Sequence, residues 1–510
     1  MRSVIANRAI SLAVLVVAVA VAAGLALWKH TATLAASAPQ RQQQSAPVDT
    51  VLRACPAPGL AGAPGSQVAL IASPGSVGSG RAVVSRIGMT ASPLVSLTQP
   101  GTVSVTSVKA VAVATHGKTP AKNPSPAPSG QAVVTTPAPG GVVIQASGAM
   151  ARGMEAEQVA PGGKISARCD GPGTDFWFTG PGAFTVGHIQ LYLMNVGSQP
   201  ADVDVLAYTD AGPLQGSTDT GVAVAPHSMV TQSLDKMLHG TRLVALNVRA
   251  SVGQVVAAVE ATTGRARSGA WLPASGPPGT RIIIPGMPPT AGTRQLFVAV
   301  PGTQDAHITL SAVTDKGSYH PTGGAGLDIP GGSVVQVSLT SLSGLFGALE
   351  ISSSVPVTAS LMTPGGPKGT PGTFTAAAPA VQEQGVVAVN QDGRGAVSSL
   401  VLSAPWRGAR VRVTEIGAGS GHGQAAPGSV LTIPAQHSAL QQLTTPAGAH
   451  RGSGFAVIIT PLPGSGPVYA GRVVISSGKG GALQSVLPVS SALTVVRLPR
   501  VQDTVVTPGG

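Results

Sequence analysis

The sequence contains little charge and few aromatic side chains. Of its 510 residues, 10% are charged and 3% are aromatic, whereas a soluble domain usually carries about 25% charged residues. Long amphipathic helices are therefore disfavoured, because they require many Glu, Lys and Leu residues. A wholly disordered chain is also disfavoured, because 43% of the residues are hydrophobic and disorder needs low hydrophobicity with high charge. The 67 glycines and 44 prolines have no three-residue period, which excludes collagen and favours an all-β chain rich in turns.

Patterns typical of catalysis, metal binding or cofactor binding are also missing. The ten histidines lie singly, and no two have the spacing of metal ligands. Asp202, Asp204 and Asp210 are neighbours, but they lack the spacing of a calcium loop and are typical of a polar strand face and its turn. The segment GHGQAA at 421–426 resembles a dinucleotide fingerprint, but no helix pattern follows it. We therefore predict no catalytic residue, no metal site and no cofactor.

The N-terminus contains one long uncharged run, from Ala9 to Leu27. As a helix with a rise of about 1.5 Å per residue, it would span about 28 Å, close to the hydrocarbon thickness of a bilayer. Arg2 and Arg8 precede it, as expected on the cytoplasmic side. A cleaved secretory signal is the alternative, although its apolar core is usually only about 7–15 residues long. We predict an uncleaved single-pass anchor in the cell membrane, with the C-terminal ectodomain outside; cleavage would make the chain secreted.

Positive charge is concentrated near the N-terminus. Residues 1–150 contain ten basic residues and one acidic residue, which gives +9 of the chain's net +12. Such asymmetry is typical of a segment that meets an anionic surface. We expect the membrane as a partner through the N-terminal helix, and anionic lipid or a cell-wall polymer through residues 1–150. Nucleic acid is not expected, because no aromatic residues are interleaved with the dispersed basic ones. The sequence identifies no protein partner.

The two cysteines, Cys55 and Cys169, are 114 positions apart (169 minus 55). Two cysteines cannot complete a zinc site with the usual close spacing. An exported chain with two cysteines most simply joins them. We therefore predict a disulfide that ties the N-terminal arm to the first complete repeat described next.

An internal repeat occupies the C-terminal two thirds of the sequence. Pro226, Pro330 and Pro434 lie 104 residues apart, and each follows a segment that alternates apolar and polar residues. These segments, at 201–210, 306–315 and 409–418, have the period of half-buried strands. An opening strand precedes each set, in DFWFTG, RIIIPG and GVVAVN, and a degenerate fourth unit precedes all three. About seven short strands per hundred residues are typical of immunoglobulin-like or fibronectin-like antiparallel β-sandwiches.

These observations divide the chain into consecutive regions. The sequence predicts an n-region at 1–8, a transmembrane signal-anchor at 9–28, an Ala/Gln/Pro linker at 29–66, a degenerate β region at 67–160 with a disordered insert at 115–130, β-sandwich repeats at 161–274, 275–379 and 380–498, and a tail at 499–510. The expected fold class is all-β, with tandem sandwiches behind one transmembrane helix.

Several segments resemble a known family. They are CDGPGTDFWFTGPG (169–182), LYLMNVGSQPADVDV (191–205), TPLPGSGPVYAGRVV (460–474) and the CPAP motif at 55–58. These segments are similar to an uncharacterised family of actinobacterial secreted or membrane-anchored proteins, whose domain has no known function. The resemblance implies an envelope protein and supplies no catalytic residue.

The expected function is that of a non-enzymatic, membrane-anchored extracytoplasmic envelope protein, a structural or interaction scaffold of tandem β-sandwich repeats. The alternative is a cell-wall polysaccharide-binding module. Sugar stacking needs exposed aromatic platforms, for which Trp177, Trp271, Trp406 and Tyr319 are the candidates. An envelope-acting enzyme is the third hypothesis, disfavoured because the sequence has no nucleophile–base pattern.

Overall fold

The computed structural model describes most of the chain between residues 45 and 498. The described residues are 45–56, 66–74, 76, 78–87, 95–97, 104–110, 131–136, 141–159, 166–214, 221–263, 268–365, 372–393, 395–417, 428–447, 454–478 and 481–498. The n-region, the anchor at 9–28, the insert at 115–130 and the tail at 499–510 lie outside them. Within the described residues, no helix is both long and apolar enough to cross a bilayer.

The chain consists of two compact units, which are described separately. The smaller comprises residues 1–46 and 496–510; its described residues include most of β1 (Ser45–Pro47) and β37 (Val495–Arg497), which pair as a two-stranded sheet. The larger comprises residues 47–495 and contains the other strands. Residues 45–55, which the composition places in a linker, instead form β1 and β2 (Thr50–Cys55).

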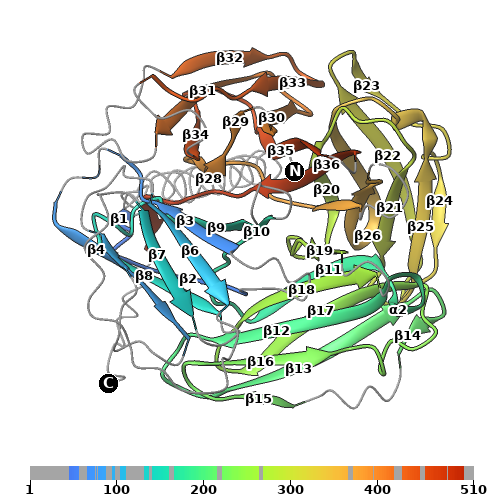
Figure 1. Cartoon of the computed structure of the whole chain (residues 1–510). Coiled ribbons are helices and arrows are strands. Elements are labelled where there is room, and N and C mark those ends of the chain that lie inside the picture. Colours follow the sequence, from blue (N-terminus) through green and yellow to red (C-terminus); the bar gives the residue numbers. More distant parts are fainter. Residues whose placement is uncertain are drawn as a thin grey trace, which may run out of the picture. The chain divides into compact units, whose positions relative to one another are not determined.

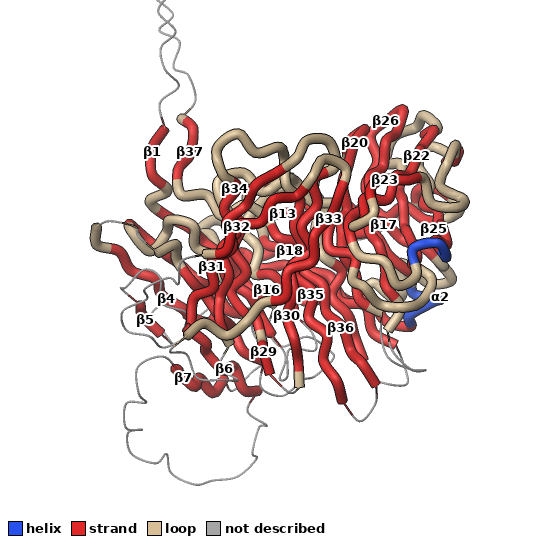
Figure 2. Tube along the Cα trace, turned by 90° about the horizontal axis from the view of Figure 1, so that it is seen from above, coloured by secondary structure: helices blue, strands red, loops and turns tan. Residues whose placement is uncertain are grey.

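Strands dominate the larger unit (Figure 2) and fall into four successive groups, called here the first to fourth β-units. The first β-unit consists of β2, β3 (Ser66–Ile71), β4 (Gly80–Arg86), β5 (Val95–Leu97), β6 (Ser104–Ala110), β7 (Gln131–Thr136), β8 (Val142–Gly148), β9 (Glu155–Val159) and β10 (Ser166–Arg168). The second consists of β11 (Asp175–Pro181), the short helix α2 (Ala183–Val186), β12 (Gly187–Asn195), β13 (Ala201–Thr209), β14 (Gly212–Pro213), β15 (Val222–Val224), β16 (Ser228–Ser233), β17 (Leu243–Val252), β18 (Val256–Thr263) and β19 (Ser268–Leu272).

The third and fourth β-units complete the larger unit. The third consists of β20 (Gly279–Met287), β21 (Arg294–Ala299), β22 (Ala306–Thr314), β23 (Gly317–Tyr319), β24 (Leu327–Ile329), β25 (Val334–Leu339), the short 3-10 helix η2 (Thr340–Leu342), β26 (Gly347–Thr363) and β27 (Thr373–Ala376). The fourth consists of β28 (Gly385–Asn390), β29 (Asp392–Gly393), β30 (Ala396–Ala404), β31 (Ala409–Gly417), β32 (Ser429–Ile433), β33 (His437–Gln442), β34 (Phe455–Pro461), β35 (Tyr469–Gly478) and β36 (Gly481–Val489). The predicted alternating segments correspond to β13, β22 and β31, and the predicted opening strands to β11, β20 and β28.

The same pairing order recurs in all four β-units. The orders are β2-β8-β4-β5 with β10-β9-β3-β6, β11-β17-β13-β15 with β19-β18-β12-β16, β20-β26-β22-β24 with β27-β26-β21-β25, and β28-β34-β31-β32 with β36-β35-β30-β33. In the third β-unit, the single long strand β26 contributes to both sheets. Among the strand pairs of known register, all are antiparallel except β6 with β7. The degenerate region that precedes the three repeats is therefore a fourth copy of the same strand arrangement.

Each β-unit buries its own apolar core between its two sheets. In the second β-unit, for example, Ile189 of one sheet and Val203 and Leu246 of the other are fully buried in a single cluster. The burial of β13 alternates along most of its length, which confirms the period-two pattern of the sequence. Residues 67–160, whose fold the sequence leaves open, have a comparable core that includes Leu70 and Ile144.

The repeated prolines lie in equivalent turns of the second, third and fourth β-units. In each of these turns the chain passes from the last strand of one row of paired strands to the last strand of the other row. Pro226 precedes β16, Pro330 lies between β24 and β25, and Pro434 lies between β32 and β33. Each turn contains a residue with positive φ, namely His227, Gly332 or Gln436. His227 therefore lies in the first of these turns, and His437 begins β33 directly after the third.

The four β-units also pack against one another in a closed cycle (Figure 1). Apolar clusters join the first to the second, the second to the third, the third to the fourth and the fourth back to the first. Their members include Val143 with Met194, Ala245 with Ala299, Phe346 with Val473, and Ile71 with Ala456. Each β-unit thus buries apolar surface against two neighbours as well as inside itself.

We predict that Gly471→Ala weakens the packing between the third and fourth β-units. A Cβ atom on Gly471 would lie 2.4 Å from the Cα atom of Gly286, so β35 and β20 would have to separate. Overpacking of this kind costs about 1–3 kcal/mol, measured as a lower free energy of unfolding in denaturant. Gly302→Ala is the control, because no atom lies within 4 Å of a Cβ at that position. Equal effects of the two variants would contradict the prediction.

Candidate binding site at the junction of the four β-units

A cavity of about 320 Å³ lies where the four β-units meet. Small-molecule sites usually have volumes of about 300–1,000 Å³, so this cavity is at the lower end of that range. Its walls come from all four β-units, and they include Arg53, Arg168 and Asp170 of the first, Asp175, Phe176 and Trp271 of the second, Ala378 from the end of the third and Leu487 of the fourth. The last strand of each β-unit, or the segment that follows it, reaches this junction.

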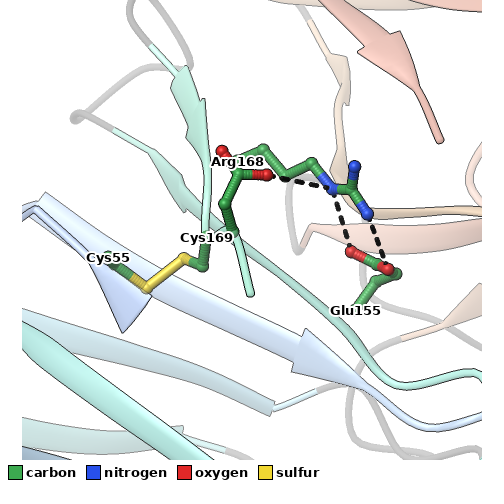
Figure 3. The surroundings of a disulfide bond; sticks show 5 residues. Cys55, Glu155, Arg168 and Cys169 are labelled. Atoms are coloured by element: carbon green, nitrogen blue, oxygen red, sulfur yellow. Dashed lines mark hydrogen bonds and ion pairs between the residues drawn. A yellow bond between two sulfur atoms is a disulfide. The ribbon is translucent and has the colours of Figure 1, made fainter. Parts of the chain in front are cut away.

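Glu155 of β9 holds two arginines at the cavity wall. Arg168 donates hydrogen bonds from Nε and Nη2 to the two carboxylate oxygens, at 3.1 and 2.8 Å, as Figure 3 shows. Arg53 donates from Nη2 to the same carboxylate at 2.9 Å. The Glu155 side chain is only 3% exposed, whereas those of Arg53 and Arg168 are 19% and 23% exposed. Bidentate hydrogen bonds between a guanidinium group and a carboxylate, such as those of Arg168, fix the orientation of the guanidinium group.

Cys55 and Cys169 form the disulfide that the sequence predicts. Cys55 is the last residue of β2 and Cys169 follows β10, and these two strands belong to different sheets of the first β-unit. The bridge therefore links the two sheets of one β-unit, rather than an N-terminal arm to the sheets that begin at β11. Both cysteines are fully buried in that unit's core.

The disulfide lies directly beside the ion pair between Arg168 and Glu155 (Figure 3). Arg168 directly precedes Cys169 and Arg53 lies two residues before Cys55, so the bridge keeps both arginines within reach of Glu155. The Ala54 amide donates to the Asp170 carbonyl at 2.9 Å, which brings the two segments together a second time. The covalent link thus supports the charged wall of the cavity.

Glu155 and Asp170 have opposite pKa shifts. Burial alone would raise the pKa of Glu155, but Arg168 and Arg53 together outweigh it and hold that pKa below its ordinary value. Burial raises the pKa of Asp170, and the two arginines offset that rise only in part. The Asp170 carboxylate lies 3.8 Å from Arg168 Nε, which is too far for a hydrogen bond. Glu155, rather than Asp170, therefore supplies the negative charge that compensates the two arginines.

A second buried ion pair lies between the first and fourth β-units. Arg472 of β35 donates from Nη2 to Glu157 of β9 and, at 2.8 Å, to Ser166 of β10. The Arg472 and Glu157 side chains are 1% and 2% exposed. Burial raises the pKa of Glu157, and Arg472 and the Val389 amide oppose that rise. Because removing either partner would leave the other charge buried and uncompensated, this pair restricts how β35 can lie against β9.

The four aromatic residues proposed from the sequence as sugar platforms have different environments. Trp271 lines the cavity, and its ring centroid lies 5.4 Å from that of the buried Tyr192. Trp177 is buried and stacks on Tyr208. Trp406 lies under the Arg281 guanidinium and donates to Glu350 at 2.9 Å. Tyr319 lies in β23, 36% exposed and outside the cavity lining. The structure therefore brings only Trp271 of these four to the cavity.

Other sequence expectations concern metal ions and the basic region. Among the described residues, no three His, Cys, Asp or Glu side chains are grouped closely enough to hold a metal ion, and Asp202 and Asp204 lie along β13. Arg53, which the sequence counts with the dispersed basic residues, is instead held by Glu155 inside the first β-unit. The signal for this arrangement was its position two residues before a cysteine, but the partner Glu155 is 102 residues away.

A comparison with known protein families gives a match. The model of a family of unknown function (DUF5719) matches residues 127–439, a span that covers the last strands of the first β-unit, the second and third β-units, and much of the fourth. A search of curated proteins returned no similar sequence.

We predict that Glu155→Gln destabilises the protein at neutral pH by about 2–4 kcal/mol, because two partly buried arginines lose their counter-charge. The pKa of Glu155 is lowered in the folded state, so its stabilisation is present above the ordinary carboxyl pKa of about 4.3 and is lost as the pH falls through the lower folded value. Denaturant unfolding of wild type and variant at several pH values measures this difference.

The control for that prediction is Asp328→Asn, because Asp328 forms an exposed pair with His307 and is itself 81% exposed. Exposed pairs contribute only about 0–1 kcal/mol. A Glu155→Gln effect no larger than the control's, or one that does not shrink in acid, would contradict the assigned role.

We predict that the unreduced, denatured chain contains no reactive thiol, because Cys55 and Cys169 are joined. Replacing both cysteines with alanine should lower the free energy of unfolding by up to about 5 kcal/mol, since the bridge closes a loop of more than a hundred residues. Thiol titration and denaturant unfolding measure the two quantities. Detection of two thiols per chain would rule out the bridge, and a double variant as stable as wild type would show that it stabilises nothing.

Proposed function

We propose that this chain, which belongs to the DUF5719 family of unknown function, is a non-enzymatic, membrane-anchored envelope protein that acts as a structural or interaction scaffold. The observation that supports this function best is the closed cycle of four β-units, each packed against two others. Such packing makes a rigid body with many outward-facing strands and loops, which suits a scaffold. The proposal includes no catalytic residue.

The proposed location outside the cytoplasm has two independent supports. A buried disulfide persists in oxidising compartments and is rare in the cytosol. The uncharged run from Ala9 to Leu27, preceded by Arg2 and Arg8, has the length and flanking charge of a single-pass anchor. The basic residues of 1–150 that follow the anchor, apart from Arg53, which pairs with Glu155, would then be available to anionic lipid or a cell-wall polymer outside the membrane.

The finer description of the fold belongs to the same proposal. A pairing pattern of two four-stranded rows, repeated at about a hundred residues and sharing the long strand β26 in the third β-unit, supports tandem sandwiches of the immunoglobulin-like or fibronectin-like class. A scaffold built from such units presents loops at the ends of its sheets, and loops commonly carry recognition.

We predict that the full-length chain stays in the membrane fraction of cells and releases no soluble fragments from isolated cell-wall material. Retention tests the anchor, because a cleaved signal would leave a mature N-terminus near residue 39 and a soluble chain. Released fragments, measured against a boiled sample of the same protein, would overturn the non-enzymatic proposal. Retention without release supports it.

The second candidate function is a cell-wall polysaccharide-binding module. The observation that favours it is the position of Trp271, an aromatic side chain at a cavity that also contains carboxylate and guanidinium groups. Co-sedimentation of the chain with cell-wall material would support this second function. A chain that binds polysaccharide could also be an interaction scaffold, but it would not be a purely structural scaffold.

A further inference from the structure

The cavity at the junction is lined by more charged groups than the ion pairs with Glu155 account for. Arg53 and Arg168 are held by Glu155, but Asp170 and Asp175 also line the space. Asp175 is exposed, although it accepts hydrogen bonds from the Trp177 and Asn247 side chains. In a chain with 10% charged residues, two aspartates and two arginines around one cavity are a concentration that packing alone does not explain.

The charged groups around this cavity are of both signs. Two arginines and two aspartates line it, and Glu155, which lies behind the arginines, accepts their hydrogen bonds and adds one further negative charge. An anionic ligand would therefore meet two carboxylates, and a cationic ligand would meet two guanidinium groups. A purely apolar ligand would take water away from these charged groups and offer them no hydrogen bond in return, at a high cost in free energy. The lining favours a neutral ligand that offers both donors and acceptors.

The remaining walls supply an apolar face. Trp271 and Phe176 are both partly exposed and line the cavity from the second β-unit. Tyr192 supports Trp271 from within its own sheet, and the Tyr192 hydroxyl donates to Glu260 at 3.0 Å. A supported aromatic ring beside hydrogen-bonding groups is suited to a molecule with one apolar face and a polar edge.

We propose that this cavity binds a neutral saccharide, with its ring against Trp271 and its hydroxyl groups bonded to Asp170, Asp175 and the arginines. Sugar rings combine an apolar face of C–H groups with hydroxyls that both donate and accept. Carboxylates accept hydroxyl hydrogens, and guanidinium groups donate to hydroxyl oxygens. This inference rests on the second candidate function and assigns it a site. It does not depend on whether the chain is a scaffold.

The test is titration of the full-length chain with four defined sugars, followed by tryptophan fluorescence and calorimetry. Cellobiose and N,N′-diacetylchitobiose are the neutral probes, glucuronic acid is the anionic one and glucosamine the cationic one. We expect at least one neutral disaccharide to bind with a Kd of about 1 mM or lower, and both charged sugars to bind more weakly. Preferred binding of a charged sugar, or no binding of either disaccharide, would overturn the proposal.

Variants locate the binding within the molecule. Trp271→Ala and Asp170→Asn should each weaken binding about tenfold or more, since each removes an interaction that the bound ligand makes in a partly desolvated site. Trp406→Phe and Asp202→Asn are matched controls, because Trp406 packs against Arg281 and Asp202 lies on β13, both away from the cavity. Normal binding in the controls with loss in the cavity variants supports the site.

The ligand preference of Asp170→Asn guards against simple misfolding. This variant removes one negative charge beside the two arginines, so its preference should move from the neutral disaccharide towards glucuronic acid. An unfolded protein would bind neither sugar, so a changed preference reports on the cavity itself. If all variants bind the disaccharide like wild type, the site lies elsewhere, even where the chain still sediments with cell-wall material.

Discussion

The fold depends on the burial of strands on both faces. In β28, Val387 belongs to the core of the fourth β-unit, whereas Val386 and Ala388 belong to the cluster shared with the first β-unit. The same division occurs in β34, where Phe455, Val457 and Ile459 face the core and Ala456 and Ile458 face the neighbour. A strand with two covered faces accepts a charged side chain only where a partner is buried with it, as for Glu155 and Glu157 in β9, so most such strands are nearly continuously apolar. The low charge of the whole chain follows from this constraint.

The same constraint explains where the few buried charges lie. The charge buried between the first and fourth β-units has a counter-charge, Arg472 with Glu157. Arg294 of β21, which is fully buried, instead donates to backbone carbonyl oxygens of Pro288 and Gly292. Other polar contacts between β-units include hydroxyl bonds, such as Ser360 to the Thr179 carbonyl at 2.7 Å and Ser438 to the Val313 carbonyl at 2.7 Å. These bonds restrict the register of one β-unit against the next, while apolar burial supplies most of the free energy.

The local elements could be predicted from the sequence because their signals are local. Period-two alternation identified β13, β22 and β31 nearly to the residue, and the disulfide followed from the number of cysteines and the compartment. The run GVVAVN also contained the signal for burial on both faces, although it suggested only a strand. The closed cycle of β-units could not be predicted from the sequence. Periodicity shows that a strand face is buried, but it does not show which of the three other β-units covers that face.

The candidate site was beyond prediction for a related reason. Its charged wall joins Arg53 to Glu155 across 102 residues, and its other walls come from strand ends in all four β-units. No spacing rule links such positions, because they are adjacent only when the cycle is closed. A space at the centre of a closed cycle is also bounded by strand ends and turns, which cannot interdigitate like the faces of sheets. The packing that covers the outer faces of the β-units therefore leaves, at their junction, a cavity that polar side chains can line.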